Sequence, residues 1–255
     1  MKPAFLLSAC LLAFAAPRLS AQTSLALRPA FALFTADQTH NEFYPTGERT
    51  RFPISIGVDA RVYQQFGQHF EVGTGIGLHK MMWAVRFDDV PIAEVKTLTG
   101  ATTDIEPTLE SAYLPKVRFE ERYWTVPLTV RYFPIARADQ KGWLYLSLEN
   151  RSWFLGGGKA VSQFRKASGG KLDGYVGAKG EPTSPALAPE ANAAFQRKTA
   201  RYMGFVAPGL GAEIRLYPSA WFVFEVSYLH GLTRPHPFIE APAGVEFCIG
   251  IQARL

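Results

Sequence analysis

The closing stretch of the chain, Val245–Leu255 (VEFCIGIQARL), alternates between two kinds of residue without interruption. One set of alternate positions is apolar: Val245, Phe247, Ile249, Ile251, Ala253 and Leu255. The positions between them are polar or small: Glu246, Cys248, Gly250, Gln252 and Arg254. Because successive side chains of a β-strand point to opposite faces, this stretch predicts a strand with one oily face and one wet face.

The same alternation recurs along the chain, in segments long enough to cross a bilayer as tilted strands of about 9–11 residues. The predicted strands are Ser24–Phe34, Phe52–Tyr63, Phe70–Met82, Arg122–Phe133, Trp143–Trp153, Tyr202–Tyr217, Ala220–His230 and Val245–Leu255. Short and long connections alternate between them, as the periplasmic turns and external loops of outer-membrane barrels do. The sequence therefore predicts an all-β fold, a closed antiparallel transmembrane β-barrel of eight strands. Lys116–Tyr123 could also pair with Ala84–Val90, either as an extension above the membrane or as a further hairpin, so a ten-stranded barrel is the alternative.

The beginning of the chain has the features of an export signal. Lys2 is followed by the apolar run Ala4–Ala16 and the small-residue cleavage site Leu19–Ala21, which predicts a signal peptide over residues 1–21 and a barrel domain over 22–255. The alternative reading of Leu7–Cys10 as a lipoprotein box is disfavoured because the apolar run continues past Cys10. No later apolar run is long enough for a spanning helix.

Removal of the signal peptide would leave a weakly charged chain. The 27 basic and 22 acidic residues of the whole sequence lose Lys2 and Arg18, so the mature chain is only slightly basic. This balance argues against nucleic acid as a partner. Cys248 would have no second cysteine to pair with, so no internal disulfide is expected.

The wet faces of the predicted strands carry equal numbers of cations and anions. This predicted lumen charge network comprises Arg28, Asp59, Arg61, Glu71, Arg131, Glu149, Arg151, Glu213, Arg215, Glu225, Glu246 and Arg254. An eight-stranded barrel is only wide enough for its own side chains to fill it, and charges packed there must pair. The balance predicts a plugged, self-neutralised lumen. Glycines share this face, which suits a narrow interior.

Aromatic residues gather near both ends of the predicted strands, where membrane barrels carry girdles at the lipid headgroups. Near the short turns they are Tyr63, Phe66, Phe70, Tyr132, Phe133, Trp143, Tyr217, Trp221 and Phe222. Near the long loops they are Trp83, Tyr123, Trp124, Trp153, Phe154, Tyr202 and Tyr228. The sequence thus predicts two girdles.

Four phrases resemble the eight-stranded outer-membrane β-barrel family of PorT-like proteins. They are FPISIGVDARVYQQFGQHFEVGTGIGLHK (52–80), YWTVPLTVRYFPI (123–135), LGAEIRLYPSAWFVFEVSYLHGL (210–232) and VEFCIGIQARL (245–255). The resemblance implies a small closed barrel in the outer membrane, with outer-membrane lipid and the barrel assembly machinery as partners. Members of the family include secretion-system components.

The two longest predicted loops, residues 83–121 and 156–201, differ in charge. The first is mainly acidic and the second mainly basic. We expect them to associate over the barrel mouth through opposite charge, and to offer a binding surface for a surface or envelope protein. Two separate solvated loops are the plainer alternative.

Few residues suggest chemistry. His79 falls on the wet face near the top of its strand and His230 on the apolar face of another, with no serine in a recognisable arrangement with either. The sequence predicts no enzyme, no cofactor and no metal. Asp88, Asp89 and Glu94 fit no named cation loop, and Gly73–Gly77 (GTGIG) lies within a strand rather than before a helix.

The predicted function is therefore that of an exported, non-enzymatic envelope protein, structural or surface-interacting, with its affinity in the loops. One alternative is a transport or secretion component. A second is a lipid-modifying enzyme that uses His79 or His230. A third is a soluble ligand-binding barrel, in which the aliphatic faces would line a cavity.

Overall fold

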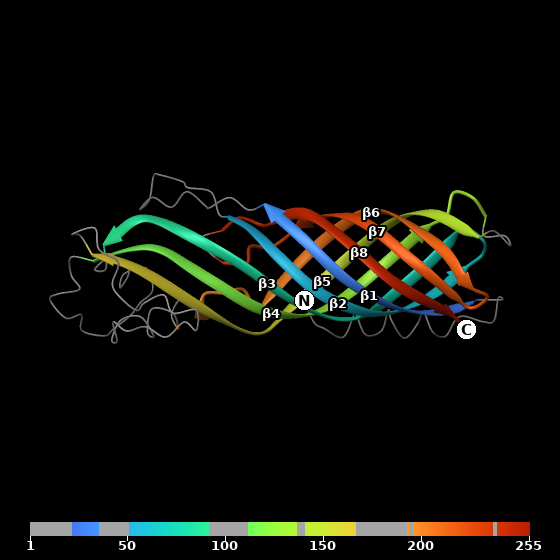
Figure 1. The fold of residues 1–255 in the computed structure, drawn as a ribbon, viewed down its shortest axis with the longest axis horizontal. Helices are drawn as coiled ribbons and strands as arrows, with labels where there is room; N and C mark the ends of the chain where they lie inside the picture. Colours follow the sequence, from blue (N-terminus) through green and yellow to red (C-terminus); the bar gives the residue numbers. More distant parts are fainter. Residues whose placement is uncertain are drawn as a thin grey trace.

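In the computed structural model the chain forms one closed antiparallel barrel (Figure 1). Each strand pairs with its neighbour in sequence, and the first pairs with the last. The strands are β1 (Thr23–Thr35), β2 (Arg51–Phe66), β3 (Phe70–Pro91), β4 (Ala112–Tyr132), β5 (Gly142–Lys166), β6 (Tyr202–Tyr217), β7 (Ala220–Gly231) and β8 (Ala243–Arg254). The eight-stranded prediction is confirmed and the ten-stranded alternative is wrong. The pairing of Lys116–Tyr123 with Ala84–Val90 occurs as an extension of β3 and β4.

The structure describes residues 22–35, 51–91, 112–136, 141–166, 193, 196–236 and 239–255. Side chains are described within these ranges except at 51–52, 85–91, 112–116 and 162–166. The predicted signal peptide at 1–21 lies outside the described residues, as does Glu94. Asp88 and Asp89 lie in β3, in the part where only the backbone is described.

Three strands are much longer than predicted. The pairing of β3 with β4 continues to Pro91 and Tyr113, and that of β4 with β5 to Ala112 and Lys166. These strands run past the ends of their neighbours at the left of Figure 1, away from the short turns and the C-terminus. Much of the predicted loop 83–121, and the first part of the predicted loop 156–201, is therefore a three-stranded extension.

The barrel turns its aliphatic side chains outward. Large apolar residues are exposed on every strand, among them Leu27, Ile56, Ile76, Leu128, Leu148, Leu210, Phe224 and Ile249. The alternate residues are buried inside; in β1, for example, burial alternates strictly from Ser24 to Phe34. The soluble-barrel alternative, which required the aliphatic faces to line a cavity, is wrong.

Glycines make room for large side chains inside the barrel. Gly57 pairs with His79, Gly73 with Tyr63 and Gly211 with Tyr145. A Cβ placed on Gly57 would lie 2.4 Å from the imidazole, and one on Gly73 would lie 2.2 Å from the Tyr63 ring. Such distances cannot be tolerated without a shift of the ring, so the small residues of the wet face are needed for the packing of the lumen.

Candidate functional site

The lumen contains a group of charged side chains from opposite walls, which we call the loop-side ion cluster: Asp59, Arg61, Glu149, Arg151 and Glu246. Arg61 donates to Asp59 Oδ2 at 2.6 Å and to Glu149 Oε2 at 2.5 Å. Arg151 donates from Nε to Glu149 Oε1 at 2.5 Å and from Nη1 to Glu246 Oε2 at 2.6 Å. Glu149 therefore accepts from two arginines, and the cluster runs across the interior from β2 to β5 and β8.

A second group, the turn-side ion cluster, lies nearer the short turns and comprises Arg28, Glu71, Arg131, Glu213, Glu225 and Arg254. Arg131 lies 3.1 Å from Glu71, 3.2 Å from Glu213 and 3.6 Å from Glu225. Arg28 lies 3.0 Å from Glu225, and Arg254 lies 2.7 Å from Glu213. Hydroxyl and amide groups complete the cluster, since Arg28 and Arg131 both donate to the Tyr63 hydroxyl at 2.9 Å.

These ionic side chains are almost wholly removed from solvent. Apart from Arg254, which is 10% exposed, each has a side-chain exposure of 2% or less. Charges buried to this degree are stable only when each is paired and hydrogen-bonded. The many cross-lumen contacts meet that requirement and leave the described interior filled by side chains.

Arg215 differs from its prediction. Its position alternates correctly with Glu213, but it lies close to the end of β6 and is exposed. Its guanidinium is 5.8 Å from the Trp221 ring, at the outer edge of the lumen. Alternation predicts whether a side chain points into or out of the barrel, but not how far along the barrel axis it lies. Arg215 was therefore predicted to be buried with the other arginines.

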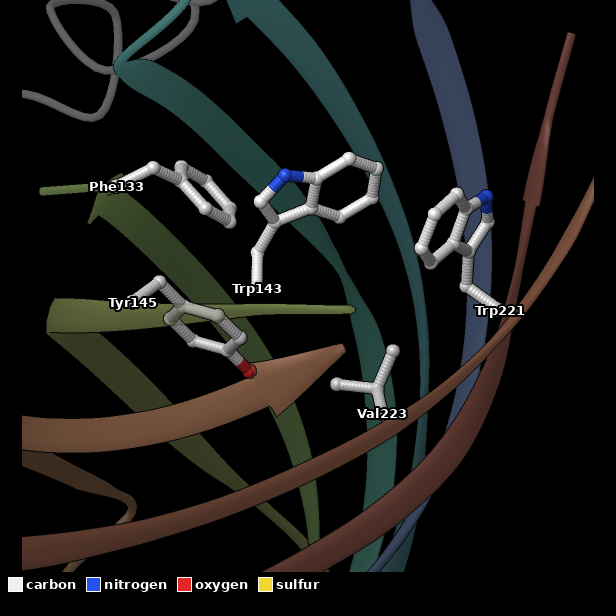
Figure 2. Packing of buried hydrophobic residues seen from close by; sticks show 5 residues of the cluster. All are labelled: Phe133, Trp143, Tyr145, Trp221 and Val223. Atoms are coloured by element: carbon white, nitrogen blue, oxygen red, sulfur yellow. The ribbon is translucent and has the colours of Figure 1, made fainter. Parts of the chain in front are cut away.

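A cluster of mainly aromatic side chains lies in the interior near the short turns (Figure 2). This turn-side aromatic layer consists of Phe133, Trp143, Tyr145, Trp221 and Val223, which converge from different strands. The Trp143 and Trp221 rings lie 4.2 Å apart, and the Arg254 guanidinium lies 4.1 Å from the Trp221 centroid. Tyr145 donates to Glu225 Oε2 at 2.7 Å and so joins this layer to the turn-side ion cluster.

A second aromatic layer lies at the loop side of the ions. Trp153 is central to it, with ring centroids at 5.1 Å from Phe205, 5.5 Å from Tyr123 and 6.4 Å from Phe34. All four rings are fully buried. The two layers enclose the ion clusters between them, which keeps water from the ion pairs and strengthens their attraction.

The predicted girdles are therefore wrong in part. Seven of the predicted girdle residues are buried in the barrel interior: Tyr63, Phe133, Trp143, Trp221, Trp83, Tyr123 and Trp153. Exposed rings remain at both ends, with Phe66, Phe70, Tyr132 and Tyr217 near the turns and Trp124, Phe154, Tyr202 and Tyr228 near the loops. The prediction used only the nearness of each ring to a strand end. The alternation of the strand also decides whether a ring points outward to a girdle or inward to the lumen.

His79 lies beside a serine and an aspartate that the sequence analysis did not connect with it. Its Nε2 is 3.0 Å from Asp59 Oδ1 and its Nδ1 is 3.4 Å from Ser55 Oγ. The sequence does contain information that predicts this contact, because the tight turn between Phe66 and Phe70 sets the register that pairs His79 with Gly57. Ser55 and Asp59 then flank the imidazole on the same face. His230 is exposed on the outer surface, so the two histidines do not share a site.

A buried carboxyl lies at the base of the strand extension. Glu121 is 2% exposed. Its Oε2 accepts hydrogen bonds from Trp83 Nε1 at 2.8 Å and from the Tyr123 hydroxyl at 2.7 Å, both neutral donors. Trp83 stacks on Phe119 at 3.9 Å, which adds an apolar wall. Burial raises the pKa of Glu121 above its ordinary value, although hydrogen bonds to the carboxylate oppose that shift.

We expect Glu121→Gln to stabilise the protein at about pH 7.5 and to give no gain at about pH 4. An acid with a raised folded-state pKa costs stability once the pH exceeds its unfolded value of about 4.3. The wild type therefore loses stability as the pH rises from there through the folded-state pKa, and the amide removes that loss. Thermal unfolding in detergent at both pH values measures the effect.

Glu120→Gln is the matched control for this experiment. Partial burial acts to raise the pKa of Glu120, but the hydrogen bond from Lys80 and the charge of Lys159 hold that pKa below its ordinary value. Loss of this carboxylate should therefore give a slight destabilisation at about pH 7.5, the opposite sign. A decrease in melting temperature for Glu121→Gln at neutral pH would contradict the assignment.

The structure also places the remaining candidate residues of the described part of the chain. Cys248 is buried in the lumen, where its Sγ lies 3.3 Å from Glu246 Oε1. Gly73–Gly77 lies within β3. The described residues hold no group of three or more side chains suited to a metal ion. They also hold no helix long and apolar enough to cross a membrane.

Comparison with known proteins gave only distant structural similarity. No protein-family model and no curated protein sequence matches the chain. Among solved structures, Ail of Yersinia pestis is 12% identical with a TM-score of 0.36, over 92% of this chain and 99% of that chain. OprG of Pseudomonas aeruginosa is 11% identical with a TM-score of 0.38, over 91% and 95%.

The outer membrane protease OmpT of Escherichia coli is 7% identical with a TM-score of 0.33, over 92% of this chain and 96% of that chain. Values this low assign neither a family nor an activity to the chain. The resemblance to PorT-like proteins stays a prediction.

Proposed function

We propose that the protein is an integral outer-membrane β-barrel with a sealed lumen, and that it acts through its surface rather than as a channel. The observation that carries this proposal is the outer wall. Large aliphatic side chains cover it on every strand, for example Leu27 at 58%, Leu148 at 56% and Ile251 at 57% exposure. An outer wall this rich in exposed aliphatic side chains would be poorly soluble in water and is suited to lipid.

The filled interior supports a role outside the lumen. Two ion clusters and two aromatic layers lie across the described interior, so a solute would have to disrupt buried ion pairs to pass. The extension of β3, β4 and β5 continues beyond the ends of the other strands. We therefore assign binding of a surface or envelope partner to this end, with residues 83–121 and 156–201 contributing.

Fractionation tests the membrane assignment. The full chain should remain with the outer membrane through carbonate and high-salt washes and should be released by detergent. Purified protein should migrate differently on a gel before and after heating, as a closed barrel resists detergent until it is heated. Recovery in the soluble fraction after a salt wash would overturn the proposal.

Lipid hydrolysis is the second candidate function, favoured by the contacts of His79 with Ser55 and Asp59. A base within reach of a hydroxyl and oriented by a carboxylate is the arrangement of a nucleophilic site. All three side chains are, however, 1% exposed or less, and Asp59 also binds Arg61. Trp153 covers the imidazole at 4.9 Å. We therefore assign these residues to lumen packing.

Ser55→Ala separates the two assignments. In the packing assignment the variant keeps any activity toward phospholipid vesicles found with the wild type, because Ser55 contributes no more than one weak hydrogen bond. Loss of such an activity in a variant that still forms a heat-resistant barrel would make hydrolysis the function.

A further inference from the structure

Four exposed cations lie together on the outer surface at the foot of the strand extension. Lys80 of β3, Arg118 and Arg122 of β4 and Lys159 of β5 form this basic patch. Lys80 pairs directly with Arg122 across β3 and β4, and Lys159 pairs with Glu120 across β4 and β5. Alternation along β4 places Arg118, Glu120 and Arg122 on the same outward face as Trp124.

Among the residues whose side chains the structure describes, a single acid lies within the patch. Glu120 is held by Lys80 at 3.2 Å and by Lys159 at 3.7 Å, and it is 30% exposed. Four cations against one anion leave a strongly positive surface. The guanidinium groups of Arg118 and Arg122 form no ion pair with another described residue. They are the members of the patch best placed to take an external anion.

The cations of the basic patch are grouped on three adjacent strands, β3, β4 and β5. Toward the loop ends of β1, β2 and β8 the described outward-facing residues are uncharged, with Thr35, Ile54 and Ala243 as the examples. Arg201 and Arg234 are further exposed cations, beside β6 and β7. The grouping of four cations on neighbouring strands indicates a localised site.

The basic patch continues the apolar wall without a gap. Next to the patch, on its side toward the short turns, lie Leu78, Trp124 and Phe154, which are 44%, 51% and 44% exposed. A soluble anion would use only the cations, whereas a lipid would place its acyl chains on the apolar residues and its headgroup on the patch. Phosphate suits this site because guanidinium groups bind its oxygens in pairs.

We propose that the basic patch binds the phosphorylated headgroup of a lipid in the leaflet on the long-loop side. This rests on the proposed membrane location. The consequence is that one lipid species is retained at the β3–β5 side of the barrel, where it contacts the base of the extension and would orient the partner-binding surface relative to the membrane.

Fluorescence quenching tests the proposal, because Trp124 is the exposed tryptophan next to the patch while Trp83, Trp143, Trp153 and Trp221 are buried. The full-length mature protein is reconstituted into phosphatidylcholine vesicles that contain chain-brominated phosphatidic acid or, in parallel, chain-brominated phosphatidylcholine. The ratio of the two quenching curves gives the relative association constant of the anionic lipid. We expect the wild type to favour phosphatidic acid.

The variant Arg118→Gln/Arg122→Gln should lower that constant at least fivefold, since each basic residue near an anionic lipid surface contributes about that factor. Arg215→Gln, which removes an exposed charge at the opposite end, should leave it unchanged. Both changes lie on exposed side chains, and heat-resistant migration confirms that each variant is folded.

Each other outcome has a distinct meaning. The lipid site would be overturned if the relative association constant of phosphatidic acid over phosphatidylcholine were one for the wild type, or if it were unchanged in the double variant. Either result would leave the membrane location intact. Absence of quenching by either brominated lipid would show that the barrel is not in the bilayer and would overturn the proposed function as well. Displacement of brominated phosphatidic acid by soluble tripolyphosphate at similar concentration would show that the patch prefers a soluble anion.

Discussion

Replacing Glu149 with glutamine is expected to lower the free energy of unfolding by about 3 kcal/mol, because removal of one partner from a buried ion pair leaves uncompensated charge. Glu149 accepts from both Arg61 and Arg151 at 2.5 Å, and its side chain is 2% exposed. The amide keeps the shape but removes the charge that both arginines share. Urea unfolding in detergent micelles measures the difference.

Glu240→Gln provides the control, since the same chemical change on an exposed carboxyl should alter stability by no more than about 0.5 kcal/mol. If Glu149→Gln were as mild as this control, the lumen would be hydrated rather than packed. The sealed-lumen account would then be wrong at its centre.

Replacing Leu128 with arginine is expected to destabilise the lipid-embedded barrel by about 2–4 kcal/mol, the effect of a cation on the lipid face at mid-depth. Leu128 is 48% exposed and lies on β4 midway between the exposed rings of Trp124 and Tyr132. Unfolding in urea from phospholipid vesicles measures this effect.

Leu216→Arg is the matched variant at the end of the wall. Leu216 is 51% exposed but adjoins Tyr217, the last residue of β6. The expected loss is about 0–1 kcal/mol because the depth dependence is steep. Equal losses at the two positions would show that the wall does not lie in a bilayer.

The parts of the strands between the short turns and the base of the extension could be predicted because two different environments act on alternate residues. Lipid on one side and packed charge on the other maintain a strict alternation, as in β1 and β8. The pairing of Lys116–Tyr123 with Ala84–Val90 was also expected, but alternation did not decide between an extension and a further hairpin. Glu120 and Glu121 are consecutive acids, so the sequence does not alternate between polar and apolar residues there. Their side chains still alternate in direction, since Glu120 points outward and Glu121 is buried.

The contents of the lumen could be predicted better than its contacts. Alternation identified the inward arginines and carboxylates, since each lies two residues from another inward position. The pairing of Arg61 with Glu149 joins β2 to β5 across the interior. Such a contact depends on how the barrel closes, which is set by the register of all the strand pairs together. Turn geometry fixes only the neighbouring hairpin, as it does for Gly57 and His79.

Conductance in planar bilayers tests the central claim most directly. The purified, heat-resistant barrel should insert without producing current steps at any applied voltage, because the paired charges and the aromatic layers leave no continuous aqueous path. Stable, ohmic current steps from the same preparation would contradict the sealed lumen and would make a transport or secretion role the better assignment.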